Sequence, residues 1–332
     1  MIKRVLAGMR PTNLLHIGNL YGSARGMVSL QENKEYETFY MVADLHATTT
    51  PFDPNDLARA TRSVVLDYLA IGLDPVKSAI FIQSDLADLH TQLAFYISSL
   101  VTVARMRHLP TFKEKAKQHP ENVTMALLNY PILMAADILI YKASMVPVGL
   151  DQKPHIEVAR QVARKMNDAY GMDFPEPQRF TIAGGEYVPS LTGEGKMSKS
   201  VEGSYISLID DLKMIKSRLA STPTDSGKGK VVPKDGGVVN LLTFVKLFEG
   251  EEKRKYYEEQ YVGSGIKYQT LKEELAEAIF KELKPIQERR KELEKKPKYV
   301  EKVLIEGAEK ARKVAKQTIQ EVKEAMGLST YI

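Results

Sequence analysis

Short apolar runs alternate with longer helical patterns along the first part of the chain. Three short runs are predicted to be strands: residues 5–8, an apolar run that ends in glycine, residues 37–42, which are rich in aromatic and β-branched side chains, and residues 78–82. Helical stretches separate them, and Asp53–Pro54 forms a favourable N-cap and first residue for one of these helices. Strand and helix in strict alternation are typical of a parallel sheet with helices on both faces. The predicted fold class is therefore α/β, with a Rossmann-like parallel sheet.

A fourth strand is expected at 145–149, between helices at 122–141 and 151–167. Together with the first three strands it completes a predicted first domain, residues 1–204. In sheets of this kind ligands bind beyond the carboxyl ends of the strands. A ligand site is therefore expected at that edge.

The character of the chain changes in its last part. Residues 221–237 are rich in glycine, proline, serine and lysine, which predicts a mobile loop. From 251 to 330, dense charge combined with apolar residues at helical spacing predicts solvated antiparallel helices, punctuated by Pro285 and Pro297. Residues 205–332 are thus predicted to be mostly α-helical, with the C-terminal helix packing back on the first domain.

Composition excludes several kinds of chemistry. The 332 residues include no cysteine, so disulfides, thiolate metal sites, iron–sulfur clusters and thiol nucleophiles are ruled out. A hydrophobic content of 43% allows a large core, and a net charge of +5 permits an acidic polymer as partner without requiring one. No apolar run reaches the ~20 residues of a membrane span, and the apolar start is expected to be a strand and not a signal peptide. We expect a cytoplasmic globular protein.

The first chemical motif, PTNLLHIGN at 11–19, lies between the first strand and a helix expected to run from His16 through Met27. A helix N-terminus offers backbone N–H groups and a positive dipole end to a phosphate. Gly18 lets a flat ring approach the backbone, and His16 and Asn19 supply donors one turn apart. Taken alone, the segment is explained about equally well as an ordinary strand–helix turn.

The second motif, KMSKS at 196–200, lies in a stretch bordered by Gly193, Gly195 and Gly203. Two ammonium groups on a flexible loop can close over a triphosphate and stabilise the charge of a departing pyrophosphate. A solvated basic loop is the alternative for an isolated lysine pair.

In this order and context, the two motifs resemble the HIGH and KMSKS signatures of class I aminoacyl-tRNA synthetases. A third stretch, YPILMAADIL at 130–139 followed by VPVGLDQ at 146–152 and His155, resembles the tryptophanyl-tRNA synthetase family in particular. The resemblance covers nearly the whole chain, most weakly between about 221 and 281. It implies a ligase that activates L-tryptophan with ATP and Mg²⁺ and transfers it to tRNA(Trp), and it makes residues 1–204 the catalytic domain that holds the ATP and amino-acid site. It further implies a homodimer, no membrane partner and no protein-bound structural metal.

The third stretch also suits an indole by its own chemistry. Ala135, Ala136 and Ile138 make an apolar helix face around the carboxylate of Asp137, and Met134 lies on the same face. An indole needs flat apolar surroundings and one acceptor for its N–H group. A surface or N-cap aspartate is the ordinary role of a lone acidic residue, but the resemblance assigns Asp137 to the indole.

The resemblance assigns further residues to each step and substrate. Charge stabilisation in catalysis is expected of His16, Lys113, Lys196 and Lys199. ATP contacts are expected of Arg10, Pro11, Thr12, Gly18, Asn19, Gly149, Leu150, Asp151, Val188, Lys196, Met197, Ser198, Lys199 and Ser200. Tryptophan contacts are expected of Asp137, Tyr130, Met134, Gln152, His46 and Leu6. Leu6, Arg10 and Asn13 differ from the family's more frequent aromatic, glutamine and glycine, which leaves the shape of the amino-acid site open.

Three other functions remain open at this point. A tyrosyl-tRNA synthetase shares the fold and both signatures, although 135–137 does not resemble its pattern. A small-molecule nucleotidylyltransferase uses a histidine motif of the first kind but is expected to lack the long helical part. A catalytically silent paralogue that only binds RNA is opposed by the intact lysine motif. If tRNA is the partner, the helical part is expected to read its unstacked anticodon bases.

Overall fold

The computed structural model describes residues 3–12, 14–118, 120–149, 152–180, 187–199 and 201–328. The chain forms two compact units, each assembled from segments distant in sequence. Unit 1 comprises residues 1–12, 25–182 and 296–332, and unit 2 comprises 13–24 and 183–295. The division of functions at residue 204 stays a prediction.

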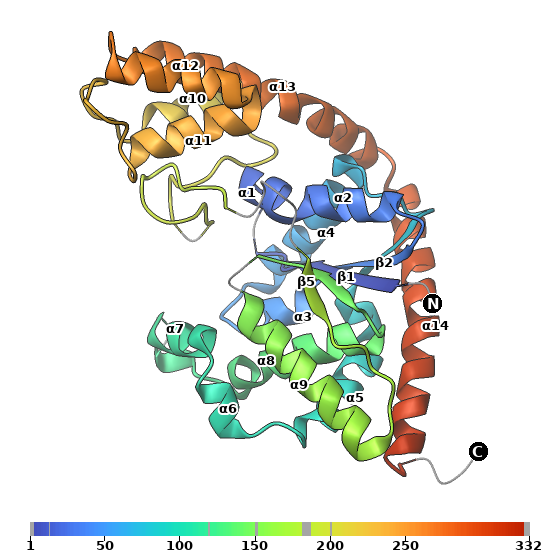
Figure 1. The fold of residues 1–332 in the computed structure, drawn as a ribbon. Coiled ribbons are helices and arrows are strands. Elements are labelled where there is room, and N and C mark those ends of the chain that lie inside the picture. The colour runs from blue at the N-terminus through green and yellow to red at the C-terminus, as the bar shows by residue number, and fades with distance from the viewer. Residues whose placement is uncertain are drawn as a thin grey trace. The chain divides into compact units, whose positions relative to one another are not determined.

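Unit 1 is built on five parallel strands (Figure 1). They are β1 (Lys3–Met9), β2 (Tyr36–Val42), β3 (Ser78–Ile82), β4 (Met145–Pro147) and β5 (Gln178–Phe180). Their order across the sheet is β3-β2-β1-β4-β5, and β1 pairs with β2 along its whole length. This is the order of a doubly wound sheet, in which ligands bind at the carboxyl ends beside the reversal between β1 and β4. The predicted Rossmann-like sheet is confirmed, and β5 is an additional strand.

Helices cover both faces of this sheet, with α2 and α4 on one side and α5, α8 and α9 on the other (Figure 1). The α-helices of unit 1 are α2 (Arg25–Glu32), α3 (Asp44–Ala47), α4 (Pro54–Ile71), α5 (Ala87–Ser98), α6 (Val103–Arg107), α7 (Pro110–Gln118), α8 (Met125–Ile140), α9 (Lys153–Tyr170) and α14 (Pro297–Ala325). Two short 3₁₀ turns, η2 (Gln83–Leu86) and η3 (Pro120–Asn122), complete it. Asp53 caps α4 as predicted, because its side chain accepts from the N–H groups of Asn55 and Asp56.

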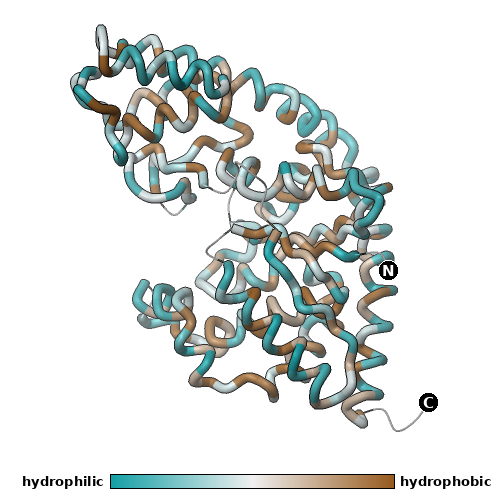
Figure 2. The backbone as a smooth tube through the Cα atoms, in the orientation of Figure 1, coloured by the Kyte–Doolittle hydropathy of each residue, from teal (hydrophilic) through white to brown (hydrophobic). Residues whose placement is uncertain are grey.

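Helix α14 covers the edge strand β3. A Cβ atom on Gly307 would lie 1.9 Å from the carbonyl oxygen of Ile80, so only glycine allows this close approach. Figure 2 shows hydrophobic and hydrophilic residues alternating along α14, and Val303, Ala311 and Ala315 are buried. The charged C-terminal sequence is therefore an amphipathic helix that protects an open sheet edge.

Unit 2 is mostly helical. It contains α1 (Ile17–Asn19), the π-helical turn η1 (Leu20–Ala24), α10 (Leu212–Ala220), α11 (Gly237–Glu249), α12 (Glu251–Val262) and α13 (Tyr268–Glu294). Residues 221–236 form neither helix nor strand, yet the carboxylate of Asp225 accepts hydrogen bonds from the hydroxyls of Tyr261 and Tyr268. Side-chain bonds therefore anchor the loop that composition alone identifies.

One expected helix break does not occur. Pro285 lies inside α13, which continues through it, whereas Pro297 begins α14 as expected. A proline removes the hydrogen bond to the carbonyl four residues earlier. That carbonyl belongs to Lys281, an exposed residue, so water can take the place of the lost donor. In the part of the chain that the structure describes, no helix is both long and apolar enough to span a membrane.

Candidate active site

The first motif begins with Pro11 and Thr12 in unit 1 and continues in unit 2. His16 is buried just before α1, and its backbone N–H donates to Asn19 Oδ1 at 3.1 Å. The helix expected from His16 through Met27 is confirmed as an unbroken helical run over residues 17–32, in which the turn η1 is π-helical. The N–H group of Ile17 donates to the carbonyl of Ile206 at 3.0 Å. That N–H group was expected to be among the donors to a phosphate, but it is already bonded. A phosphate at this helix N-terminus would therefore depend more on the side chains of the motif, such as those of His16 and Asn19.

The second motif lies on a short antiparallel hairpin in unit 2. The N–H of Met197 donates to the carbonyl of Val188 at 2.9 Å, and the N–H of Ser190 donates to the carbonyl of Gly195 at 3.0 Å. Gly193 and Gly195 both have positive φ and form the turn. Met197 is buried, so it anchors the hairpin while Lys196 stays exposed and Lys199 half-buried. The hairpin hydrogen bonds and the buried Met197 thus hold the backbone of the motif in place, while the two lysine side chains lie nearer the surface.

The two motifs meet at Gly18. A Cβ atom there would lie 2.8 Å from the imidazole of His16 and 3.3 Å from the Cβ of Met197. Burial and the charges of Lys199 and Lys196 lower the pKa of His16 to about 3, so its imidazole is neutral at pH 7. Its buried Nδ1 has no hydrogen-bond partner among the described residues. A neutral imidazole beside two lysines is suited to donating a hydrogen bond to an anion without competing for its proton.

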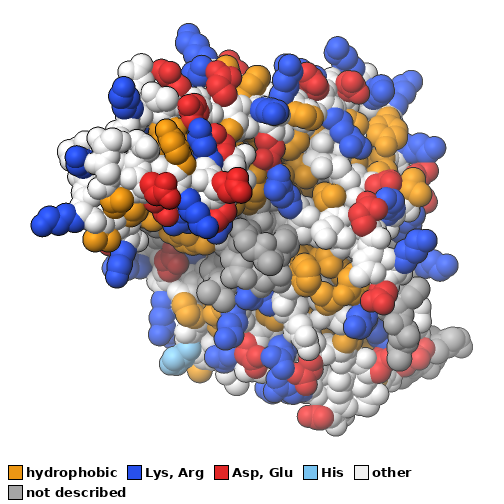
Figure 3. Space-filling model, turned by 45° about the horizontal axis from the view of Figure 1, so that its top comes forward, with side chains coloured by type: hydrophobic (Ala, Val, Ile, Leu, Met, Phe, Trp, Pro, Cys, Tyr) orange, Lys and Arg blue, Asp and Glu red, His pale blue; other side chains and the backbone are white. Residues whose placement is uncertain are grey.

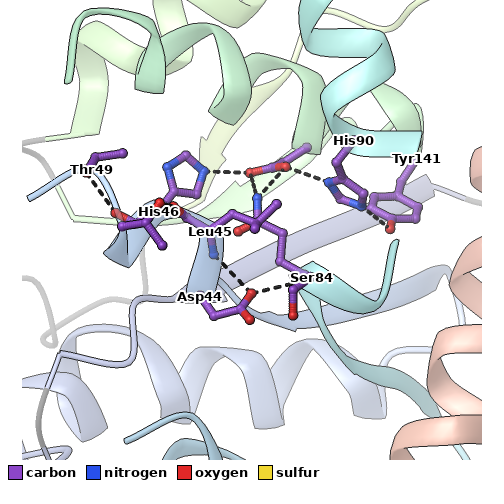
Figure 4. A network of polar contacts seen from close by, with 10 residues as sticks. Asp44, Leu45, His46, Thr49, Ser84, His90 and Tyr141 are labelled. Atoms are coloured by element: carbon purple, nitrogen blue, oxygen red, sulfur yellow. Dashed lines mark hydrogen bonds and ion pairs between the residues drawn. The ribbon is translucent and has the colours of Figure 1, made fainter. Parts of the chain in front are cut away.

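In unit 1, Asp137 is the centre of a buried polar network (Figure 4). Its carboxylate accepts from His46 Nε2 at 2.7 Å, from His90 Nδ1 at 2.6 Å and from Gln83 Nε2 at 2.8 Å. The two histidines approach from opposite sides, and the hydroxyl of Tyr141 lies 2.8 Å from His90 Nε2. Burial alone would raise the pKa of Asp137, but the bonds from His46 and His90 lower it to about 2. Asp137 is therefore a carboxylate held ionised in an apolar interior, not a surface aspartate.

A second polar chain adjoins the first. The hydroxyl of Tyr130 lies 2.5 Å from His155 Nε2, and His155 Nδ1 lies 2.9 Å from Gln152 Oε1. The ring of Tyr130 packs edge-on against that of His46, with 6.3 Å between centroids. Four of the residues expected to contact tryptophan are therefore brought together in unit 1.

Strand ends explain why these side chains converge. His46 lies on α3 directly after β2, Gln83 follows β3 without a gap, and Gln152 follows the loop after β4. The segment carrying His46 is pinned by Asp44 Oδ1, which accepts from the N–H groups of Leu45 and Ser84 (Figure 4). Parallel strands bring such residues to one edge of the sheet.

The remaining predicted residues are distributed over both units. Leu6 is buried on β1, and Met134 packs against the same hydrophobic core from α8. Lys113 is exposed on α7, and Arg10 lies directly after β1. Of the expected ATP contacts, unit 1 holds Arg10, Pro11, Thr12 and Gly149, and unit 2 holds Gly18, Asn19, Val188, Lys196, Met197, Ser198 and Lys199. Leu150, Asp151 and Ser200 lie outside the described residues.

Sequence reasoning missed four polar residues of unit 1: Gln83, His90, Tyr141 and, as a residue with a role, His155. Gln83 could have been found from its place at the carboxyl end of a predicted strand. His155 follows Gln152 by three residues, which places both on one face of a helix. Tyr141 follows Asp137 by four residues at the end of the same helix, a spacing that places the two one turn apart. His90 carries no such signal, because only the fold brings it to Asp137. Among the described residues, no group of three or more His, Asp or Glu side chains could hold a metal ion.

Comparison with known proteins agrees with these arrangements. Residues 3–284 match the family model described as tRNA synthetases class I (W and Y). The tryptophan–tRNA ligase of Porphyromonas gingivalis is 38% identical over 98% of this chain and 99% of its own. The tryptophanyl-tRNA synthetase structure from Mycoplasma pneumoniae superposes with a TM-score of 0.87 at 30% identity, covering 99% of both chains. That from Campylobacter jejuni, complexed with ADP and tryptophan, gives 0.84 at 33% identity and covers 98% of this chain and 99% of its own. The chain therefore belongs to the class I tRNA synthetase family of the tryptophan and tyrosine enzymes.

Proposed function

We propose that this enzyme is a tryptophan–tRNA ligase. In the first step the tryptophan carboxylate attacks the α-phosphate of ATP, which forms tryptophanyl-adenylate and releases pyrophosphate. In the second step a hydroxyl at the 3′ end of tRNA(Trp) attacks the acyl carbon, and AMP leaves. The full-length likeness to tryptophan–tRNA ligases supports this assignment over that of a tyrosine enzyme.

The observation that carries the specificity is the ionised, buried Asp137. Its apolar surroundings suit an aromatic ring, and its carboxylate suits one N–H donor. Tyr130 and Gln152 are proposed to bind the ammonium and carboxylate groups of the amino acid, and Met134, His46 and Leu6 to line the ring.

The first step requires no protein nucleophile or general base, because the attacking carboxylate is already ionised. We propose that catalysis consists of positioning and charge stabilisation by His16, Lys113, Lys196 and Lys199. We propose that ATP is bound by the residues that the resemblance assigns to it, from Arg10, just before the first motif, to Ser200 in the second, and that they contact both its phosphates and its adenosine. Mg²⁺ is proposed to enter on the phosphates of ATP, where it neutralises charge.

The tRNA and a second copy of the chain are the proposed macromolecular partners. Lysine and arginine side chains lie among acidic ones over the face drawn in Figure 3, so no single basic patch there marks the RNA site. Residues 205–332 are proposed to read the anticodon. Phe95, Val103 and Met125 are large apolar residues that stand exposed on α5, α6 and α8, which supports a homodimer through this surface. We place the reaction in the cytoplasm.

Amino-acid-dependent exchange between ATP and radiolabelled pyrophosphate tests the proposal across all twenty amino acids. Exchange should depend on tryptophan and be far weaker with tyrosine or phenylalanine. Faster exchange with tyrosine would overturn the specificity, and no exchange with any amino acid would overturn the activity. Charging of tRNA(Trp) by the same preparation tests the second step.

A further inference from the structure

The carboxylate of Asp137 is nearly saturated before any ligand arrives. Two carboxylate oxygens offer about four lone-pair positions. Oδ1 accepts from His90 and Gln83, and Oδ2 accepts from His46 and, at 3.0 Å, from Gln83. Because the Gln83 amide is one donor shared between the two oxygens, three donors occupy the carboxylate and Oδ2 can take one more. That single position limits what a ligand can offer: it must supply a donor.

The direction of the hydrogen bonds in this network can be deduced from Tyr141. The side chain of Tyr141 is fully buried, and among the described residues its hydroxyl contacts one polar atom, His90 Nε2, at 2.8 Å. A buried hydroxyl donates its proton wherever an acceptor exists, because an unpaired donor is costly. Burial and the charge of Asp137 raise the pKa of Tyr141 well above its usual value, so the proton stays on the hydroxyl. Tyr141 therefore donates, and His90 Nε2 accepts.

Both contacts of His90 require the same tautomer. The ionised carboxylate of Asp137 can only accept, so the imidazole proton is on Nδ1, 2.6 Å from Asp137 Oδ1, and Tyr141 donates to Nε2 and holds the ring in this orientation. Neither residue was expected to matter from the sequence, and both lie on the opposite side of the carboxylate from His46 (Figure 4). The hydroxyl, the imidazole and the carboxylate thus form a one-way chain of donors toward Asp137.

We propose that His90, oriented by Tyr141, is a positioning residue that fixes Asp137 so that its one remaining acceptor position selects the indole N–H. The inference rests on the proposed function, because it concerns how the same site chooses its amino acid. Removing the Tyr141 hydroxyl takes away the contact that holds the far edge of the His90 ring. The ring is then free to turn, its Nδ1–H is no longer held on Asp137 Oδ1, and the carboxylate loses its fixed orientation.

The test compares tryptophan with β-(3-benzothienyl)alanine, in which sulfur replaces the N–H group at nearly the same size. The chain contains no tryptophan, so the emission of bound tryptophan reports its own binding and its displacement by the analogue without ATP. Wild type should prefer tryptophan by roughly 10- to 100-fold, the range expected for one lost buried hydrogen bond. Tyr141→Phe should lower this preference by about 5-fold.

Tyr40→Phe is the matched control. Tyr40 is also a fully buried tyrosine of unit 1, and its hydroxyl donates to the carbonyl of Met27 at 2.5 Å. Tyr40→Phe loses the same kind of buried hydrogen bond, but Tyr40 has no hydrogen bond to the Asp137 network. The preference of this variant for tryptophan over the analogue should therefore equal that of wild type. A structural defect would weaken both ligands alike and leave the ratio unchanged.

His90→Asn supplies an independent arm that does not depend on the folding of Tyr141→Phe. An asparagine amide can donate from near the position of Nδ1 without help from Tyr141. In the His90→Asn background, Tyr141→Phe should therefore change the preference less than twofold. Unchanged preference in Tyr141→Phe alone, or an equal loss in Tyr40→Phe, would overturn the inference. Failure of wild type to bind tryptophan would instead overturn the proposed function.

Discussion

Asp137 in unit 1 and His16 in unit 2 are both buried ionisable side chains, yet the first is held charged and the second neutral. Burial disfavours the charged form of each, which acts to raise the pKa of the acid and to lower that of the base. Around Asp137, hydrogen bonds from two histidines outweigh burial and bring the pKa to about 2. Around His16, the charges of Lys199 and Lys196 act in the same direction as burial and bring the pKa to about 3.

The difference shows that burial alone sets the direction at His16, where the neighbouring charges add to it, whereas at Asp137 the neighbouring donors reverse it. Unit 1 keeps an anion whose surroundings all donate, which suits recognition of a neutral N–H group. Unit 2 keeps a neutral imidazole among cations, which suits a polyanion. Amino-acid recognition and phosphate chemistry should therefore be separable by mutation, because a substitution near Asp137 alters the first and a substitution near His16 alters the second.

The largest effect is expected from Lys199→Ala. Its ammonium would act on the departing pyrophosphate, an interaction stronger in the transition state than in the ground state. Loss of one such contact lowers rate by roughly 10²- to 10³-fold. Pyrophosphate exchange at saturating tryptophan measures it, with Lys213→Ala, an exposed lysine on α10, as the control. If both variants lose rate equally, the motif has no special role.

Removal of the carboxylate at Asp137 should destabilise the fold. Asp137→Ala leaves donors of His46, Gln83 and His90 buried without a partner. We expect the free energy of unfolding to fall by about 3 kcal/mol, measured by urea denaturation. Asp168→Ala, on the exposed face of α9, should change it by less than about 0.5 kcal/mol. Equal losses would mean that the network contributes nothing particular.

A smaller, pH-dependent effect is expected from His16. Its folded pKa of about 3 lies below the 6.5 of an unperturbed histidine, so the unfolded state binds the proton first as pH falls. As the pH falls from about 6.5 to about 3, His16 lowers the free energy of unfolding, and at pH 5 this loss is about 2 kcal/mol. His16→Gln lacks this titration.

Urea denaturation of both proteins at pH 7 and pH 5 measures the difference. Wild type should lose about 2 kcal/mol more than His16→Gln over this interval. An identical loss in the two proteins would show that His16 is protonated in the folded state, and would remove the contrast with Asp137.

The sequence predicts the sheet and its covering helices well, because apolar strand runs and helix N-caps such as Asp53 are local signals. The π-helical turn η1 and the continuation of α13 through Pro285 depend on tertiary surroundings, so periodicity alone does not reveal them. The candidate site divides in the same way. Asp137, His46, Tyr130 and Gln152 lie in recognisable stretches or at strand ends, and Tyr141 follows Asp137 by one helical turn. His90 reaches Asp137 only through the packing of α5 on α8.

The dissociation constant of tryptophan without ATP tests the separation of the two roles most directly. It is measured from the emission of the ligand in wild type, Asp137→Asn and Lys199→Ala. The account predicts that Asp137→Asn raises it at least about tenfold, because the charged acceptor is lost, while Lys199→Ala leaves it within about twofold. A similar rise in both variants, or a rise in Lys199→Ala alone, would contradict the account.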